Sequence, residues 1–377
     1  MKTLLLIDDS GSPHGQAVVR RRYPPRIAAL LRLDVQPVLV TLRGERQLHN
    51  ELRTDLGVSS YALGFSGGRD SLRTLRRFSQ IVASENPDLV QAHEVVPALF
   101  AGIALLFRRQ QPVLYSRHHT TGGWKLNAGS RAAARVCSGT VVASQAVLAC
   151  ARRIDHTPAR KVHIVGSGVA DLRRVSEEEI RDLRGDLSIP EEAAVVGTLA
   201  RLRHEKGLDV LIDAMDELQR LAEREVHVVI VGEGPERALL QRRSESDRLH
   251  LVGHRDDIAP WYALMDVVAM PSRREALGQV TAEAMAAGKP LVVSSVGGLP
   301  EAVLDGVNAL LVPPDEPHSL AQALARVLRD TKTAGSMGRA SRRRYEEIFT
   351  MERAVEREVA CWTRILDGAA MRFGGNG

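Results

Sequence analysis

The chain is poor in cysteine and in aromatic side chains. Its three cysteines, Cys137, Cys150 and Cys361, are odd in number and far apart. They make neither a paired disulfide framework nor a C-x-x-C metal site, and they fit a reducing cytosol. Aromatic residues make up 4% of the sequence, too little for a stacking platform that binds single-stranded nucleic acid. These shortages exclude a disulfide-rich scaffold and disfavour nucleic acid as a partner.

Long hydrophobic runs are also missing. The longest apolar stretch, residues 97–107, is about half as long as the roughly 20 residues that a membrane-spanning helix needs. Near the N-terminus a short apolar run ends at Asp8 and Asp9, and it is too short for the core of a signal peptide. We therefore expect a cytoplasmic protein that is soluble or at most peripheral at the inner face of the cell membrane.

Charge is plentiful but unevenly distributed. The 377 residues are 44% apolar and 26% charged, which is typical of a globular protein of two domains. The net charge is +5, yet residues 1–170 hold 23 lysines and arginines against 11 acidic residues, and the remainder holds 28 against 35. A basic half favours contact with anionic lipid head groups or an acidic acceptor, although solvation of exposed arginines explains it equally well. No nucleic-acid recognition motif accompanies this charge.

Short apolar runs alternate with helical patterns along the whole chain. Such runs are typical of parallel strands covered by helices on both faces. We predict an α/β fold of two doubly wound, Rossmann-like parallel sheets that face a central cleft and join near residues 167–190. Helical patterns occupy residues 208–218, 319–328 and 339–366. Strands are expected at 2–7, 35–41, 88–92, 112–116, 139–143 and 162–165, and at 194–200, 226–231, 249–252, 266–270, 290–294 and 309–312.

Two cations follow the strand expected at 194–200. Arg201 and Lys206 lie five positions apart in its strand-to-helix loop, and ligands of parallel sheets bind beyond the carboxyl ends of the strands. A guanidinium fork and a mobile ammonium together suit a diphosphate. Taken alone, two loop cations are more often simply solvated, so this pair needs support from other residues.

That support comes after the strand expected at 266–270. Gly278 opens a helix there, and a glycine at a helix start lets backbone N–H groups approach a phosphate. Glu275 precedes this helix and Glu283 lies about one turn inside it. Because carboxylates repel an anion, we expect both to accept hydrogen bonds from sugar or ribose hydroxyls. An ordinary surface-helix glutamate is the alternative for each.

Together these residues resemble the retaining glycosyltransferases of family 4, which have the GT-B fold. The resemblance rests on Glu275 and Glu283 with seven residues between them, on Gly278, and on Arg201 with Lys206. It is dense over 195–330 and sparser but ordered in the first half. The further matching pieces read VGEGPERALL at 231–240, HLVGHRDDIAPWYALMDVVAMPS at 250–272, AMAAGKPLVVSSVGGLPEAVLDGVNALLVPPDE at 284–316, PDLVQAH at 87–93, PVLYSRHH at 112–119, TVVASQ at 140–145 and KVHIVGSGV at 161–169.

The resemblance implies three segments. Residues 1–170 would form an N-terminal acceptor-binding domain and residues 171–350 a C-terminal domain that binds the nucleotide-sugar. Residues 351–377 would form a helix that crosses back to the first domain. Two departures from the family concern the first loop, where Gly15 is the better candidate for a phosphate-facing glycine, and residues 167–170, which read Ser-Gly-Val-Ala instead of the common Asn-Gly-Val-Asp.

The resemblance also implies roles for individual residues. Arg201 and Lys206 would hold the donor diphosphate and stabilise the leaving group, while Glu275 would bind the transferred sugar. Glu283 would bind the ribose, and His118, after the strand at 112–116, would contact the donor sugar from the first domain. Leu277, Gly278 and Gln279 would offer backbone contacts around the distal phosphate and the sugar. Gly15 would face a phosphate, and His119, the neighbour of His118, is a further candidate for a contact with substrate.

No metal or cofactor is expected. The chain contains no D-x-D triplet, and the cations with the helix start would make a divalent ion redundant. The donor would be a UDP-sugar, or next a GDP-sugar, and the product a hexosyl glycoside. The acceptor would be a hydroxyl of a glycan, lipid-linked or cell-envelope molecule, as in polysaccharide biosynthesis, with a small natural product as an alternative.

Other functions remain compatible with some of these features. A GT-B relative, such as a sugar-nucleotide epimerase or a phosphorylase, would keep the same phosphate site. A nicotinamide dehydrogenase is disfavoured because the Gly-x-Gly runs at 166–168 and 232–234 lack the third glycine. The G-x-S-x-G run around Ser66 fits a serine hydrolase, but no His or Asp partner can be placed. His93 could touch an acceptor, although a structural role is the simpler interpretation.

Overall fold

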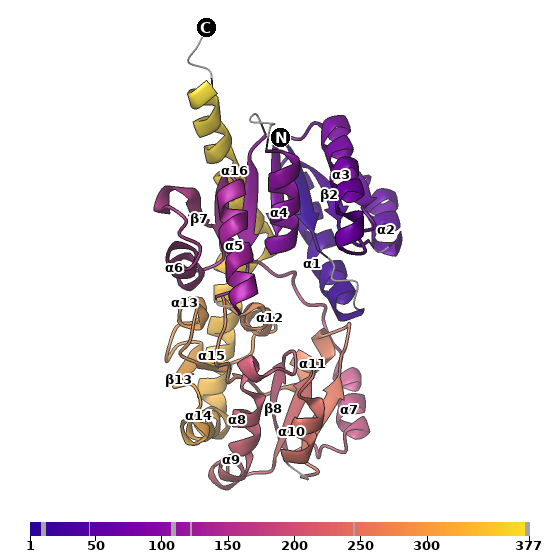
Figure 1. Ribbon diagram of the computed structural model, residues 1–377. Coiled ribbons are helices and arrows are strands. Elements are labelled where there is room, and N and C mark those ends of the chain that lie inside the picture. The colour runs from indigo at the N-terminus through magenta and orange to yellow at the C-terminus, as the bar shows by residue number, and fades with distance from the viewer. Residues whose placement is uncertain (9–12, 45, 107–110, 121–122, 244–245, 374–377) are drawn as a thin grey trace. The chain divides into compact units, whose positions relative to one another are not determined.

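The computed structural model of the chain divides by its contacts into two compact units. Unit 1 comprises Met1–Ser167 and Met351–Gly377, and unit 2 comprises Gly168–Thr350. Each unit contains one parallel sheet flanked by helices (Figure 1), which confirms the predicted α/β fold with two doubly wound sheets. The residues whose structure is described are 1–8, 13–44, 46–106, 111–120, 123–243 and 246–373.

Unit 1 is built on a sheet with the strand order β3-β2-β1-β4-β5-β6-β7, in which every pair is parallel. The order reverses between β1 and β4, so their carboxyl ends form the topological switch point of this unit. All strands expected in this half are present, and the short strand β3 was not predicted. The strands are β1 (Lys2–Ile7), β2 (Gln36–Thr41), β3 (Ser60–Ala62), β4 (Leu89–His93), β5 (Val113–Arg117), β6 (Gly139–Val142) and β7 (Val162–Ile164).

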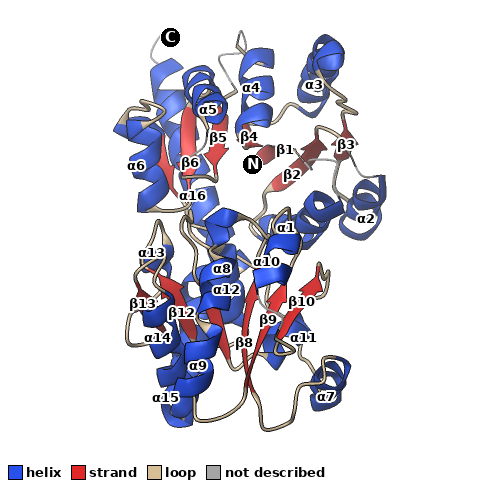
Figure 2. Cartoon of the chain, turned by 60° about the horizontal axis from the view of Figure 1, so that its bottom comes forward, coloured by secondary structure: helices blue, strands red, loops and turns tan. Residues whose placement is uncertain are grey.

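Helices cover both faces of this sheet. Successive residues of β1 point to opposite faces, so Leu5 joins a core cluster with Trp362 and Leu4 joins another with Phe78. Figure 2 shows the strands between their helices. The helices of unit 1 are α1 (Pro13–Arg32), α2 (Arg46–Leu56), α3 (Ser71–Glu85), α4 (Val95–Ala104), α5 (Trp124–Val136), α6 (Gln145–Arg153) and α16 (Met351–Phe373).

The last helix, α16, is fastened to the first unit by a buried polar network. Glu358 pairs with Arg26 of α1 and accepts a hydrogen bond from Gln91 of β4 at 2.6 Å. The Trp362 indole N–H donates to Gln91 at 2.6 Å. Because all four side chains are buried, this network fixes the position of α16 along β4.

Unit 2 repeats the same plan with six parallel strands in the order β10-β9-β8-β11-β12-β13. Its switch point lies between β8 and β11, and all six strands expected from the sequence are present. They are β8 (Ala194–Leu199), β9 (Val226–Val231), β10 (Leu249–Gly253), β11 (Val267–Met270), β12 (Leu291–Ser294) and β13 (Ala309–Val312). The helices are α7 (Glu177–Asp186), α8 (Leu208–Asp213), α9 (Met215–Leu221), α10 (Arg237–Arg243), α11 (Ala259–Leu264), α12 (Gln279–Ala286), α13 (Leu299–Ala302), α14 (Pro317–Arg329) and α15 (Thr331–Arg344).

The helical pattern at 339–366 is not one helix. Helix α15 ends before a π-helical turn at Tyr345–Phe349, and α16 begins after Thr350. Tyr345 and Phe349 are buried in the core of unit 2, whereas α16 belongs to unit 1. The apolar spacing continues across the break, and no proline or glycine marks it.

Within the described residues, no helix combines the length and apolarity that crossing a bilayer requires.

Candidate active site

The candidate site of unit 2 lies where β8 and β11 end. These strands are parallel neighbours at the switch point, so the loops that follow them leave the sheet side by side. Lys206, in the turn His204–Lys206 after β8, lies against Glu275 in the loop after β11, with Nζ and Oε2 2.5 Å apart. The two loops that the sequence pointed to therefore meet.

Glycine at position 207 allows this close approach. Gly207 has a φ of 62°, and a Cβ at this position would lie 2.0 Å from the carbonyl oxygen of Pro271 in the β11 loop. Glycine alone satisfies both the left-handed backbone and the lack of space. Gly207 thus lets the loop that carries Lys206 lie against the loop that carries Glu275.

Arg273 fastens the β11 loop to helix α8. Its guanidinium binds Asp209 through two hydrogen bonds of 2.8 Å, and its Nε lies 2.5 Å from Asp315. The Arg273 backbone N–H also donates to the Glu205 carbonyl at 2.9 Å. The hydrogen bond from Arg273 lowers the pKa of the Asp209 carboxyl. Neither partner was predicted from the sequence, because residues 64 positions apart leave no local pattern.

The start of helix α12 lies beside Glu275. Gly278 caps this helix with a φ of 82°, and a Cβ there would lie 2.6 Å from Thr281 Oγ1 and 3.4 Å from Glu275 Cγ. The backbone N–H groups of Leu277, Gly278 and Gln279 form no hydrogen bond with any residue that the structure describes. Amides without partners at a helix start bind anions, so this turn can hold a phosphate.

Glu283 and Arg201 complete the predicted set in unit 2. Glu283 is 3% exposed and accepts a hydrogen bond from the Tyr262 hydroxyl at 3.0 Å, so it is not an ordinary surface glutamate. Arg201 begins the loop after β8 and is exposed, and its guanidinium has no hydrogen bond or ion pair within the described part of the chain. Arg201 is therefore available to an anionic ligand.

The other predicted residues belong to unit 1. His118 and His119 follow β5, and Gly15 lies in the first turn of α1. The loop at 10–16, predicted to face a phosphate, is described only from residue 13 onward, because residues 9–12 lie outside the described part of the chain. Unit 2 thus brings Lys206, Glu275 and the start of α12 together, and unit 1 holds the histidines.

His118 is supported by a second histidine. His93 Nδ1 lies 3.1 Å from His118 Nε2, and the two rings stack with their centroids 5.4 Å apart. Burial, together with the charge of Arg22, lowers the pKa of His118 to about 4, so its ring is neutral at pH 7. His93 is 4% exposed, which supports a structural role for it. His118 can therefore offer a neutral hydrogen-bonding group to a ligand.

His119 has protein partners on both sides of its ring. Its Nδ1 lies 3.3 Å from Glu94 Oε2, and its Nε2 lies 3.0 Å from Ser130 Oγ of α5. Its carbonyl accepts a hydrogen bond from Arg117, whose buried guanidinium pairs with Asp155 at 2.7 Å. These contacts fix the loop after β5 and leave neither ring nitrogen of His119 without a partner.

Glu94 was not predicted, and its backbone is unusual. It is the first residue after β4, at the switch point of unit 1, with a φ of 73° and a ψ of 173°. Glycine almost alone occupies this region, and other residues pay about 1–3 kcal/mol to adopt it. No sequence pattern reveals such strain in a glutamate. Strain of this kind concentrates at functional sites.

The structure does not support an active site at two other motifs of the sequence, the G-x-S-x-G run around Ser66 and the Gly-x-Gly run at 232–234. Ser66 is exposed and bonds to Asp70, and among the described residues no histidine contacts it, so a nucleophile elbow gains no support. Gly232 and Gly234 pack the loop after β9 against the β8 loop, because a Cβ at Gly232 would lie 1.9 Å from the Ala200 carbonyl oxygen. Their close spacing thus has a packing reason.

Unit 2 also has a pocket that is separate from the loops after β8 and β11. Its volume is about 780 Å³, and the ends of α9 and α14, with Arg224 and Arg329, line it. These helix ends lie at the amino-terminal edge of the sheet, opposite the loops described above. None of the residues predicted from the sequence to bind substrate lines it.

Two family models match different parts of the chain. The model described as Glycosyltransferase Family 4 matches residues 27–171, and the model described as Glycosyl transferases group 1 matches residues 193–330. D-inositol 3-phosphate glycosyltransferase of Jonesia denitrificans is 31% identical over 57% of this chain and 54% of its own length. Glycogen synthase of Mycobacterium tuberculosis is 31% identical over 71% of this chain and 66% of its own length. The chain thus spans about half to two thirds of these curated relatives.

Solved structures share the fold along the whole chain. Anabaena HepE in complex with UDP and glucose has a TM-score of 0.80 and 23% identity, with 96% of this chain and 99% of that chain covered. Sucrose-phosphate synthase from Thermosynechococcus elongatus has a TM-score of 0.75 and 20% identity, with 98% and 100% covered. At this identity the likeness shows the fold, two Rossmann-like units of the GT-B type. With the family models, it confirms the resemblance seen in the sequence: the chain belongs to glycosyltransferase family 4.

Proposed function

We propose that the chain transfers a hexosyl group from a nucleotide-diphosphate sugar to a hydroxyl acceptor, with retention of the anomeric configuration. The donor is a UDP-sugar, with a GDP-sugar as the second choice. The observation that carries the proposal is the ion pair of Lys206 and Glu275 beside the amides of residues 277–279, which have no partner among the described residues. A cation, a carboxylate and a helix start in one place suit a ligand with phosphates and sugar hydroxyls.

The phosphate side of this site stabilises the leaving group. Arg201 and Lys206 bind the diphosphate, and the backbone of Leu277, Gly278 and Gln279 surrounds the distal phosphate and the sugar. Sugar transfer passes through an oxocarbenium-like transition state, in which negative charge grows on the departing phosphate. Fixed cations and a helix start at that phosphate stabilise the transition state more than the ground state.

The sugar side uses carboxylates and a neutral histidine. Glu275 binds hydroxyls of the transferred sugar, and Glu283 binds the ribose. His118 contributes a contact with the donor sugar from unit 1, and Gly15 faces a phosphate there. The likeness to Anabaena HepE, which was solved with UDP and with UDP-glucose, supports this type of donor.

The transfer needs no protein base in this proposal. The bond between the acceptor oxygen and the anomeric carbon forms as the bond from that carbon to the diphosphate oxygen breaks, on the same face of the sugar. The acceptor's proton passes to the departing diphosphate oxygen, so charge and atoms balance. Arg201 and Lys206 hold that oxygen in place, which lowers the entropy cost of the step.

We propose that the reaction is independent of metal. Arg201, Lys206 and the start of α12 supply the positive charge that a divalent ion would otherwise bring to the diphosphate. Among the described residues, no cluster of three or more His, Cys, Asp or Glu side chains could hold a metal ion. Activity in the presence of a chelator tests this point directly.

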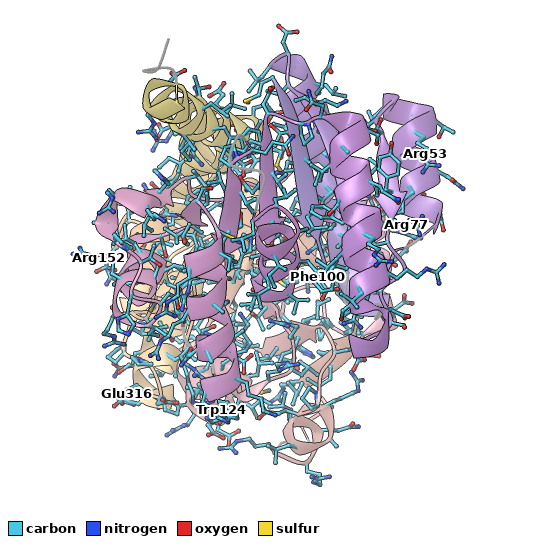
Figure 3. The ribbon with its side chains drawn as sticks, turned by 45° about the horizontal axis from the view of Figure 1, so that its top comes forward. Arg53, Arg77, Phe100, Trp124, Arg152 and Glu316 are labelled. Atoms are coloured by element: carbon cyan, nitrogen blue, oxygen red, sulfur yellow. The ribbon has the colours of Figure 1, made fainter. Side chains whose placement is uncertain are left out.

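The acceptor is proposed to be a glycan, lipid-linked or cell-envelope molecule. Unit 1 carries exposed apolar side chains next to basic ones: Trp124 at the start of α5 (Figure 3) is 77% exposed with Lys125 Nζ 5.7 Å from its ring centroid, and Leu72 on α3 is 74% exposed and is followed by the exposed Arg73. Aromatic and basic side chains together suit the surface of an anionic membrane. Peripheral binding there would bring the enzyme to a lipid-linked acceptor.

The test is the release of nucleoside diphosphate from a donor panel. UDP-glucose, UDP-N-acetylglucosamine, UDP-galactose and GDP-mannose are incubated with the protein and EDTA, and the products are separated by chromatography. Slow release from one donor by transfer to water is expected and would fix the base and the sugar. No release and no binding of any donor would refute the proposal, and isomerisation of the donor or dependence on phosphate would indicate an epimerase or a phosphorylase.

A further inference from the structure

Glu94 occupies a backbone conformation that favours glycine. Its φ of 73° and ψ of 173° place the Cβ in a region that L side chains avoid. Its backbone N–H is held by the Ser116 carbonyl at 3.0 Å, so the conformation is fixed by the neighbouring strand. A glycine would fit this position without strain, and the presence of a long acidic side chain therefore needs another reason.

One oxygen of the Glu94 carboxylate is held by a histidine, and the other has no partner in the part of the chain that the structure describes. Oε2 lies 3.3 Å from His119 Nδ1, and His119 is itself held by Ser130, whose Oγ lies 3.1 Å from the Tyr115 hydroxyl. Oε1 makes no hydrogen bond within the described residues, and the side chain is 47% exposed. One oxygen is thus oriented by a chain of side chains, and the other has no hydrogen-bond partner among the described residues.

The charge of Glu94 decides what it can bind. Burial raises the pKa of its carboxyl, but the hydrogen bond from His119 and the nearby charge of Arg22 oppose that effect, and the pKa is lowered. An ionised carboxylate only accepts hydrogen bonds. It repels a phosphate and attracts a hydroxyl, and an oriented carboxylate binds a hydroxyl more strongly than a neutral acceptor does.

We propose that Glu94 is a specificity-determining residue of unit 1 that accepts a hydrogen bond from a hydroxyl of a polyhydroxylated acceptor, other than the hydroxyl that is glycosylated. This inference rests on the proposed function and names the class of acceptor, a sugar or cyclic polyol. The position of Glu94 at the β1–β4 switch point, where ligands of doubly wound sheets bind, agrees with this role. Glu94 selects such acceptors against alcohols with a single hydroxyl.

His119, which was expected to contact substrate, orients the Glu94 carboxylate in this arrangement. Because both of its ring nitrogens contact protein side chains, it acts as a positioning residue that orients the Glu94 carboxylate. Replacing His119 would then disturb the acceptor through Glu94, whereas Glu94 itself touches the acceptor.

The experiment compares transfer to polyols with transfer to water. Wild type, Glu94→Gln and Glu94→Gly are incubated with the donor identified by the release assay and with myo-inositol, glucose, glycerol or 1-propanol as acceptor probes. We expect at least one polyol to be a better acceptor than 1-propanol with wild type. In both variants the ratio of polyol transfer to water transfer should fall roughly 10- to 100-fold, mainly through the KM for the polyol, since a charged hydrogen bond is lost.

A second readout separates this role from a structural one. Glu94→Gly relieves the backbone strain, so its Tm should equal or exceed that of wild type while the polyol ratio falls. Asp34→Gly is the matched control, because Asp34 is an exposed residue of unit 1 with a φ of 54° and should change Tm in the same direction but leave the ratio as it is.

The outcomes are distinct. A polyol ratio within twofold of wild type in Glu94→Gln, or a wild type that prefers no polyol to 1-propanol or water, would overturn the inference and leave the proposed transferase function standing. A wild type that cleaves no donor would refute the proposed function, and the inference would fall with it. A fall in both Tm and the ratio for Glu94→Gly would show a structural residue instead.

Discussion

Lys206 shows how much can depend on one side chain in unit 2. Its side chain is 18% exposed and its Nζ lies 2.5 Å from Glu275 Oε2, so its charge acts in a site with little solvent around it. Electrostatic contacts are stronger in such surroundings than in bulk water. The exposed Arg201 lacks this shielding, and we therefore assign the larger share of leaving-group stabilisation to Lys206.

Lys206→Ala should keep the fold and lose turnover. Removing one preorganised charge at a developing anion typically costs about 10²–10³ in rate, so we expect nucleoside-diphosphate release to slow by that factor, with little change in Tm. Steady-state release of nucleotide by the purified variant measures the effect. Lys332→Ala, at an exposed lysine on α15, is the matched control. Turnover within threefold of wild type for Lys206→Ala would contradict the assignment.

At the scale of elements, the start of α12 requires both a positive φ and free space at the same residue, Gly278. Gly278 must adopt a φ of 82°, and it must leave room for Thr281 and Leu299, whose atoms would lie 2.6 and 2.7 Å from a Cβ. Gly306 has a similar φ of 72° but no atom within 4 Å of its Cβ position. The two glycines therefore separate backbone strain from crowding within the same unit.

Gly278→Ala should be the more damaging of the two alanine substitutions. Both changes place an L residue in the left-handed region at a cost of about 1–2 kcal/mol, but only the first must also push the helix start away from its neighbours. We expect a larger drop in Tm and a raised KM for the donor in Gly278→Ala, and a drop in Tm alone in Gly306→Ala. Thermal unfolding and donor titration measure both. Equal donor KM values in the two variants would argue against a phosphate at this helix start.

The elements also show what the sequence could and could not predict. Buried parallel strands appear as apolar runs, and so the strands around the site, including β8 and β11, were predicted. The loops beyond them were expected to carry the donor site, but the contact of Lys206 with Glu275 was not predicted. The short strand β3 and the break at Tyr345–Phe349 leave no signature in periodicity. The bond between Arg273 and Asp209 and the strained backbone of Glu94 depend on three-dimensional packing, which a single sequence does not record.

At the scale of the whole molecule, the two units differ in their buried histidines. In unit 1, burial lowers the pKa of His49 and His118 to about 4 and that of His93 well below its usual value. In unit 2, burial lowers the pKa of His250. Histidines held neutral in the folded state bind protons on unfolding, so each of them couples stability to pH.

Unit 1 should therefore lose stability as the pH falls from about 6.5 toward 4. In that window the unfolded chain binds protons that the folded unit does not, which favours unfolding, and above about 6.5 the effect vanishes because the histidines are neutral in both states. For the buried His49 alone the loss is on the order of 2–3 kcal/mol. Hydrogen exchange of peptides from β1, β4 and β5, compared with β8 and β11 and corrected for intrinsic rates, measures it at about pH 7 and about pH 5.

The variant His49→Gln isolates one contribution to this difference. It removes a titrating ring that lies 2.9 Å from Thr41 Oγ1 inside unit 1, so protection of the unit 1 strands should fall less between about pH 7 and about pH 5 than in wild type. His318→Gln, at a side chain that is 64% exposed in unit 2, should leave the pH dependence of both units as it was. If the two variants instead behave alike, or if the strands of unit 2 lose protection first, buried histidines do not set the acid stability of unit 1.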